Sequence, residues 1–201
     1  MSEAISTIAI APHGKPVWER PDRGTVGMAC LIIAESAIFI IFVVAYIFYL
    51  GKSLSGPTPA QVLELPIFGS ICLLSSSATI HYAVSALRKN NRRSCVFSLG
   101  ATVLLGTIFL ITTGLEWRHL IYDCGLTIRT NLFGSTYYSL VGLHATHVVV
   151  GLIMLSLAFI LALGGRVHEE HAEKLEVLSL YWHFVDAVWI VVFLVVYVLG
   201  R

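Results

Sequence analysis

The apolar segment at residues 178–199, LSLYWHFVDAVWIVVFLVVYVL, contains two side chains that could take part in chemistry, His183 and Asp186. The segment is long enough to cross a bilayer, where an ionisable group costs about 3 kcal/mol or more unless it finds a partner. Positions three apart share one face of a helix. We therefore expect both groups to meet polar partners on neighbouring helices, beside the amphipathic rings of Tyr181, Trp182 and Trp189.

Similar groups lie in other apolar segments of the chain. Glu35 is the only formal charge in the first segment, His81 lies in the second, and His144 and His147 share a helix face in the fourth. The fourth and last segments are joined by a short connection, so we expect them to be antiparallel neighbours whose polar faces could meet.

One interpretation of these groups is a metal or haem site. Haem bound by two histidines needs one from each of two facing helices, and metal-binding bundles repeat their ligand motifs. The predicted membrane segments offer a single HxxH, at His144 and His147, and no second motif of that kind. A stand-alone histidine-ligated membrane oxidoreductase therefore remains an alternative with little support from spacing.

A second interpretation is a proton path, in which Glu35 relays protons as a small transporter would require. Such a path needs polar groups that reach both surfaces. The second and third segments offer mainly hydroxyl groups, at Ser75–Ser77, Thr79, Thr112 and Thr113. A third interpretation is structural: the polar groups form hydrogen bonds between helices, and small residues such as Gly142 and Gly151 allow close approach.

Composition assigns the chain to the membrane proteins. Hydrophobic residues make up 57% of its 201 residues and charged residues 12%, which is more apolar surface than a water-soluble domain can bury. The net charge of +1 argues against a nucleic-acid partner. The four cysteines lie far apart, so their spacing predicts neither a zinc site nor a disulfide framework.

Five apolar segments reach the length of about 20 residues that a membrane helix needs. Each must be helical, because an isolated strand cannot satisfy its backbone hydrogen bonds in lipid. The fold class predicted is therefore an all-α membrane bundle of residues 25–201, after a polar N-terminal segment at 1–24. The five predicted spans are 26–50, 66–87, 95–115, 135–163 and 178–199.

Lysine and arginine placement predicts a cytoplasmic N-terminus and a C-terminus outside. In that orientation nine cations are inside and four outside. The inside set is Lys15, Arg20, Arg23, Arg88, Lys89, Arg92, Arg93, Arg166 and Lys174; the outside set is Lys52, Arg118, Arg129 and Arg201. The cluster Arg88, Lys89, Arg92 and Arg93 is also a candidate site for anionic lipid headgroups, although it could serve as a topology anchor alone.

The ordered motifs of the chain resemble subunit III of the haem-copper oxidases, the cytochrome c oxidase subunit III family. The similarity covers residues 25–201 and runs through all five predicted spans. The motifs are AESAIFI at 34–40, GPTP at 56–59, GLEWRHLI at 114–121, LFGSTYYSLVGLHATHVVVGL at 132–152 and YWHFVDAVWIVVF at 181–193. The chain resembles the five-helix bacterial form. It departs from the usual pattern at Ala34 and Ala145, where the family has serine and glycine.

The resemblance implies a role without redox chemistry in this chain. It implies that haem and copper are held by partner subunits of a proton-translocating cytochrome c or quinol oxidase in the bacterial inner membrane. It also implies packing against the catalytic subunit I, support of its proton uptake, and bound phospholipid. Glu35 is then the buried functional carboxyl group. The expected interhelix hydrogen-bond network, with partners among its own members and Glu35, is Glu116, His144, His147, His183 and Asp186.

Overall fold

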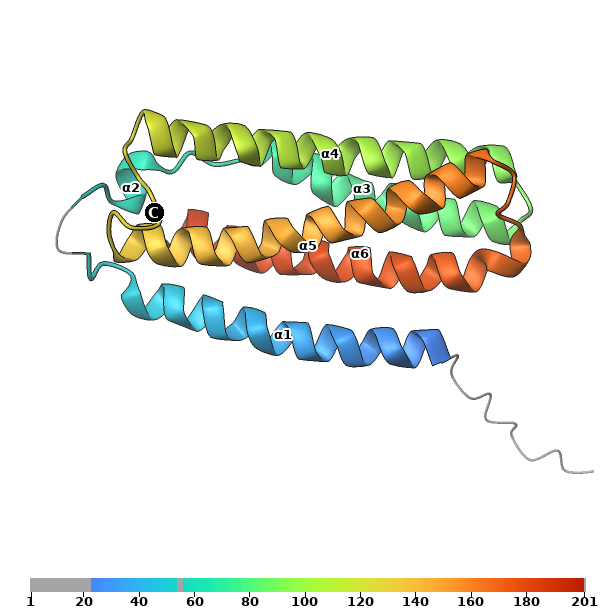
Figure 1. The fold of residues 1–201 in the computed structure, drawn as a ribbon, viewed down its shortest axis with the longest axis horizontal. Coiled ribbons are helices and arrows are strands. Elements are labelled where there is room, and N and C mark those ends of the chain that lie inside the picture. Colours follow the sequence, from blue (N-terminus) through green and yellow to red (C-terminus); the bar gives the residue numbers. More distant parts are fainter. Residues whose placement is uncertain (1–22, 54–55, 201) are drawn as a thin grey trace, which may run out of the picture.

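The computed structural model describes residues 23–53 and 56–200 (Figure 1). Of the predicted polar segment 1–24, residues 1–22 lie outside the described residues, and so do the cations Lys15, Arg20 and Arg201. The described chain is helical, with short connections. Its elements are α1 Arg23–Tyr49, α2 Pro59–Val62, α3 Ile67–Arg88, α4 Arg92–Tyr122, α5 Leu132–Leu163, the 3₁₀ turn η1 Glu169–His171, α6 Ala172–Phe193 and the π-helical turn η2 Leu194–Leu199.

Five helical stretches in the described part of the chain are long and apolar enough to cross a membrane. They are α1, α3, α4, α5 and the continuous stretch Glu169–Leu199, so the prediction of an all-α bundle with five spans is confirmed. Large apolar side chains cover the outside of the bundle; Phe97, for example, exposes 80% of its surface. Hydrocarbon, not water, suits a surface of that kind.

Capping residues mark several helix ends. The side chain of Asn91 accepts a hydrogen bond from the Ser94 N–H at 3.2 Å, and Asn131 does the same for Gly134 at 2.8 Å, so both asparagines cap the starts of their helices. At the end of α5, Gly165 adopts φ +78°, a left-handed conformation that glycine tolerates and that stops the helix.

The four helices α3 to α6 form the body of the bundle, and α1 lies along one side of it (Figure 1). α3 packs most extensively on α4, and α6 packs on both α3 and α5. α1 contacts α5 and α6 and buries only Phe39 and Tyr46. The α3–α4 connection, the α5–α6 connection and the start of α1 lie at one end of the bundle, called here the α3–α4 end (Figure 1).

Two helices extend beyond the spans predicted within them. α4 does not end at residue 115 but continues to Tyr122, and the last helix begins at Ala172 instead of 178. The extra turns carry charged residues such as Glu116, Arg118 and Lys174, which the hydropathy pattern assigned to connections. At 1.5 Å per residue, the 31 residues of α4 extend about 46 Å, well beyond a hydrocarbon core of about 30 Å. The polar turns therefore reach the aqueous interface as helix.

Candidate functional site

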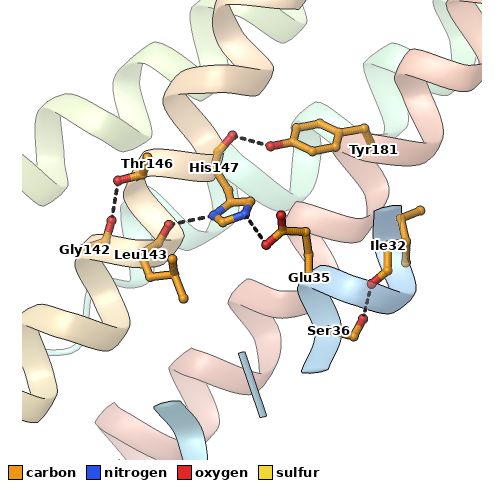
Figure 2. Close-up of polar contacts among 8 residues, drawn as sticks. All are labelled: Ile32, Glu35, Ser36, Gly142, Leu143, Thr146, His147 and Tyr181. Atoms are coloured by element: carbon orange, nitrogen blue, oxygen red, sulfur yellow. Dashed lines mark hydrogen bonds and ion pairs between the residues drawn. The ribbon is translucent and has the colours of Figure 1, made fainter. Parts of the chain in front are cut away.

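The carboxyl group of Glu35 and the imidazole of His147 form the polar contact between α1 and α5 (Figure 2). The distance from His147 Nε2 to Glu35 Oε2 is 3.1 Å. The other ring nitrogen, Nδ1, lies 2.8 Å from the carbonyl oxygen of Leu143. A carbonyl oxygen only accepts, so Nδ1 carries the hydrogen of that contact. The imidazole ring also packs against the ring of Phe39, with centroids 5.0 Å apart.

One proton is shared between His147 Nε2 and the Glu35 carboxyl group. Either a protonated Glu35 donates to a neutral ring, or an imidazolium donates to the carboxylate. The net charge of the pair is zero in both cases, which lowers the cost of placing it among apolar side chains. Tyr181 of α6 donates a hydrogen bond of 3.2 Å to the backbone oxygen of His147, so three helices meet at this point (Figure 2).

A groove opens at this pair between α1, α5 and α6. Its volume is about 370 Å³, and Glu35 and His147 line it together with apolar side chains such as Met28, Leu31 and Val150. The side chains of Glu35 and His147 are 26% and 13% exposed. The groove therefore has a mostly apolar lining that includes the Glu35–His147 pair.

The predicted residues His183 and Asp186, both on α6, share one partner on α3, Ser77, instead of bonding to each other. Ser77 donates a short hydrogen bond to Asp186 Oδ2, and its hydroxyl oxygen lies 2.9 Å from His183 Nδ1. Since that hydroxyl gives its hydrogen to the carboxylate, the imidazole is the donor of the second contact. The other carboxylate oxygen, Asp186 Oδ1, has no hydrogen-bond partner among the described residues. Sequence reasoning named Ser77 only as one of several hydroxyl groups, and the run of three serines at 75–77 was the available signal.

Two tryptophans of α6 reinforce the same contact. Trp182 Nε1 donates to Ser76 Oγ at 2.7 Å, and Trp189 Nε1 donates to Ser70 Oγ at 3.0 Å. Both rings are fully buried. We call these contacts, with those of Ser77, the α3–α6 seam. The N–H group of each buried tryptophan ring donates to a serine hydroxyl group there.

Glu116 lies in a third cluster, near the end of α4. Its Oε1 accepts hydrogen bonds from the hydroxyl groups of Tyr197 at 2.8 Å and Tyr137 at 3.2 Å. The two hydroxyl oxygens are themselves 3.2 Å apart. The cluster joins α4, α5 and η2, and sequence reasoning identified Glu116 but neither tyrosine.

His144 departs from the expected network. It is fully buried, and neither ring nitrogen has a hydrogen-bond partner in the described part of the chain. Its ring stacks on Trp189 with centroids 5.0 Å apart and an angle of 28° between planes. The hydrogen bond expected from His144 is not seen among the described residues, where aromatic rings pack around its imidazole. His81, the remaining membrane histidine, is exposed.

Two of the four cations in the predicted lipid cluster have protein partners. Arg88 forms an ion pair with Glu176, and the guanidinium group of Arg92 donates to the backbone oxygens of Ala162, at 2.9 Å, and Leu163, at 3.1 Å. Arg92 therefore caps the last carbonyl groups of α5. Lys89 and Arg93 are exposed at the same end.

The sequence matches the family described as cytochrome c oxidase subunit III over residues 21–201. It is 39% identical to cytochrome c oxidase subunit 3 of Synechocystis over 89% of this chain and 77% of the relative. It is 34% identical to the protein of the same description from Alkalihalophilus pseudofirmus, over 92% of this chain and 95% of the relative. For the corresponding protein of Bacillus sp. strain PS3, the values are 31%, 96% and 94%. The chain therefore belongs to the cytochrome c oxidase subunit III family, in a five-helix form similar to these bacterial proteins.

Proposed function

We propose that this chain packs against the catalytic subunit I of its oxidase, stabilises that subunit, supports its proton uptake and binds structural phospholipid. Membership of the family makes the chain a subunit of an oxidase complex, and the chain itself carries no redox centre. Haem and copper then belong to partner subunits, and electrons pass through the complex without passing through this chain.

The observation that carries the lipid part of this proposal is the groove at Glu35 and His147. Its mostly apolar lining suits the acyl chains of a lipid. The polar groups that an acyl chain would contact there form a pair without net charge. Because α1 buries so little of its own surface, a lipid in this groove adds contacts that hold α1 to α5.

The described cations support the orientation with the N-terminus inside a bacterial cell. Seven lie at the α3–α4 end, and three lie at the opposite end (Figure 1). The excess of positive charge marks the cytoplasmic side. The seven are Arg23, Arg88, Lys89, Arg92, Arg93, Arg166 and Lys174, and the three are Lys52, Arg118 and Arg129.

Anionic lipid headgroups are expected near Lys89 and Arg93. Both cations are exposed at the α3–α4 end, whereas Arg88 and Arg92 are engaged by Glu176 and the end of α5. Each free cation near an anionic surface adds about 1 kcal/mol of attraction.

The experiment that tests the proposal replaces Glu35 in the intact oxidase. Glu35→Ala removes the partner of His147, and Glu173→Gln, an exposed carboxyl group outside the groove, is the matched control. We expect Glu35→Ala to leave the haem spectra unchanged while reducing co-purified phospholipid, measured by mass spectrometry, and shortening the turnover lifetime.

Two results would contradict the assigned role. Loss of haem incorporation in Glu35→Ala would assign the residue to assembly of the redox centres instead. Phospholipid content and turnover lifetime equal to those of Glu173→Gln would show that the groove at Glu35 does not hold functional lipid.

A further inference from the structure

A second group of chemically active side chains lies outside the membrane segments, in the connection between α5 and α6. Among the described residues, His168, Glu170 and His171 are the one group of three potential metal ligands whose ligand atoms all lie within 4.8 Å of one another. We propose that these three residues bind a divalent transition-metal ion of the zinc class. The proposal concerns a site separate from the groove at Glu35 and does not depend on it.

The donor set suits that class of ion. Zinc in proteins takes imidazole nitrogen and carboxylate oxygen at about 2.0–2.2 Å, and two histidines with one glutamate are a known catalytic ligand set that leaves a position open for water. Magnesium and calcium prefer oxygen ligands alone, so two imidazole groups select against them. The histidines, at 168 and 171, are spaced for one turn of 3₁₀ helix.

The backbone holds the two histidines at this spacing before any ion arrives. The N–H of His171 donates to the backbone oxygen of His168 at 2.9 Å, which closes the turn η1. The backbone N–H of His168 also points at His171 Nδ1, at a long 3.4 Å. The ring centroids are 6.2 Å apart.

Only side-chain rotation is needed to complete the site. Tetrahedral bonds of about 2.1 Å separate ligand atoms by about 3.4 Å, so the group has to contract by roughly 1–1.5 Å. Glu170 Oε1 already lies 3.9 Å from His171 Nδ1, and the Glu170 side chain is 76% exposed. Exposed side chains change rotamer freely, so the backbone of η1 does not have to move.

The local charge favours a cation. The segment 166–176 contains four glutamates and two basic residues, Arg166 and Lys174. Glu176 is engaged by Arg88, which leaves Glu169, Glu170 and Glu173 around the two histidines. Their negative charge offsets the positive end of the α6 dipole, which would otherwise oppose a bound cation. A metal ion here would lie at η1, directly before the start of α6.

The test uses the intact oxidase complex, treated with a chelator and then titrated with zinc chloride. Bound zinc is counted per haem after equilibrium dialysis in the wild-type complex and in a His168→Gln/His171→Gln variant. The control is His119→Gln, which alters an exposed histidine at the opposite end of the bundle. Because other subunits contribute their own sites, the informative quantity is the difference in bound zinc between complexes.

We expect the double variant to bind one equivalent of zinc less than the wild-type complex and the His119→Gln control to match the wild type. Glu170→Gln should weaken this one site by at least about tenfold, a loss that even outer-shell partners produce. Equal zinc stoichiometry in the wild type and the double variant would overturn the proposal. So would an X-ray absorption spectrum whose imidazole contribution is unchanged in the double variant.

Discussion

The α3–α6 seam and the contact of Glu35 on α1 with His147 on α5, called here the α1 edge, both place ionisable groups in the membrane, yet they are built differently. In the seam, Asp186 is 3% exposed and lies between two tryptophan–serine hydrogen bonds, on helices that pack closely. At the edge, Glu35 is 26% exposed, and its helix buries only two residues.

The difference separates two uses of a polar group in hydrocarbon. A fully enclosed carboxyl group depends on one fixed donor, because nothing else can reach it. A carboxyl group at the wall of a groove can exchange its partner for water or a lipid headgroup. The seam is therefore expected to determine how the helices assemble, and the edge to determine what binds beside them.

The largest effect is expected where α5 packs closely against Trp182, a member of the seam. A Cβ atom at Gly151 would lie 2.8 Å from the ring of Trp182, whereas one at Gly114 would meet nothing within 4 Å. Gly151→Ala should therefore destabilise the subunit by about 1–3 kcal/mol through overpacking. Gly114→Ala should be neutral or slightly stabilising, because alanine is the better helix former. Thermal unfolding in detergent measures the stability of both variants. Equal melting temperatures would show that Trp182 does not pack tightly against Gly151.

The next effect concerns the buried carboxyl group. Ser77→Ala removes the donor to Asp186 and should cost about 1–2 kcal/mol. Ser75→Ala, on the exposed side of the same helix, is the matched control and should change little. The comparison is made by chemical unfolding of the detergent-solubilised oxidase. If the two variants are equally stable, Asp186 does not depend on Ser77.

A double-mutant cycle on the α1 edge should give a smaller coupling. Glu35→Ala and His147→Ala, alone and together, are expected to show a coupling free energy below about 1 kcal/mol, within the range of membrane hydrogen bonds. The reason is that the groove lets water or lipid replace the lost partner. A coupling larger than the stability lost in Ser77→Ala would reverse the contrast between edge and seam.

The smallest effect is expected at the exposed end of α3 and α6. Arg88 and Glu176 form an ion pair whose side chains are 56% and 43% exposed. Exposed pairs contribute little and are screened by salt. A cycle of Arg88→Ala and Glu176→Ala should give a weaker coupling than the cycle of Glu35 and His147, falling towards zero as salt is raised. Persistence of the coupling at high salt would show that this pair is shielded by neighbouring parts of the complex.

The fold follows from the sequence wherever a helix is apolar from end to end. The predicted span 26–50 corresponds to α1 at Arg23–Tyr49, and 66–87 corresponds to α3 at Ile67–Arg88. The helix α4 is longer than the span predicted within it, because hydropathy indicates the part that lies in lipid, whereas the helix continues past that part. Trp117 and Arg118 keep helical geometry in the part of α4 that extends beyond the apolar run.

The partners of the polar groups were harder to predict than their positions. Periodicity places Glu35, His147 and Asp186 on helix faces, but the choice between a serine, a tyrosine and a second histidine depends on how helices rotate against each other. Tyr137 and Tyr197 are 60 residues apart in the chain and converge on Glu116 only in three dimensions. His144 shows the reverse case, since stacking on Trp189 replaces a hydrogen bond.

The position of α1 has a consequence for biogenesis. The ribosome makes α1 first among the described helices, yet its main neighbours, α5 and α6, are made last. Glu35 precedes His147 by 112 residues, so at roughly 5–20 residues per second the carboxyl group waits about 6–20 seconds for its imidazole. During that interval α1 lacks the helices that it packs against most, and the carboxyl group of Glu35 lacks His147.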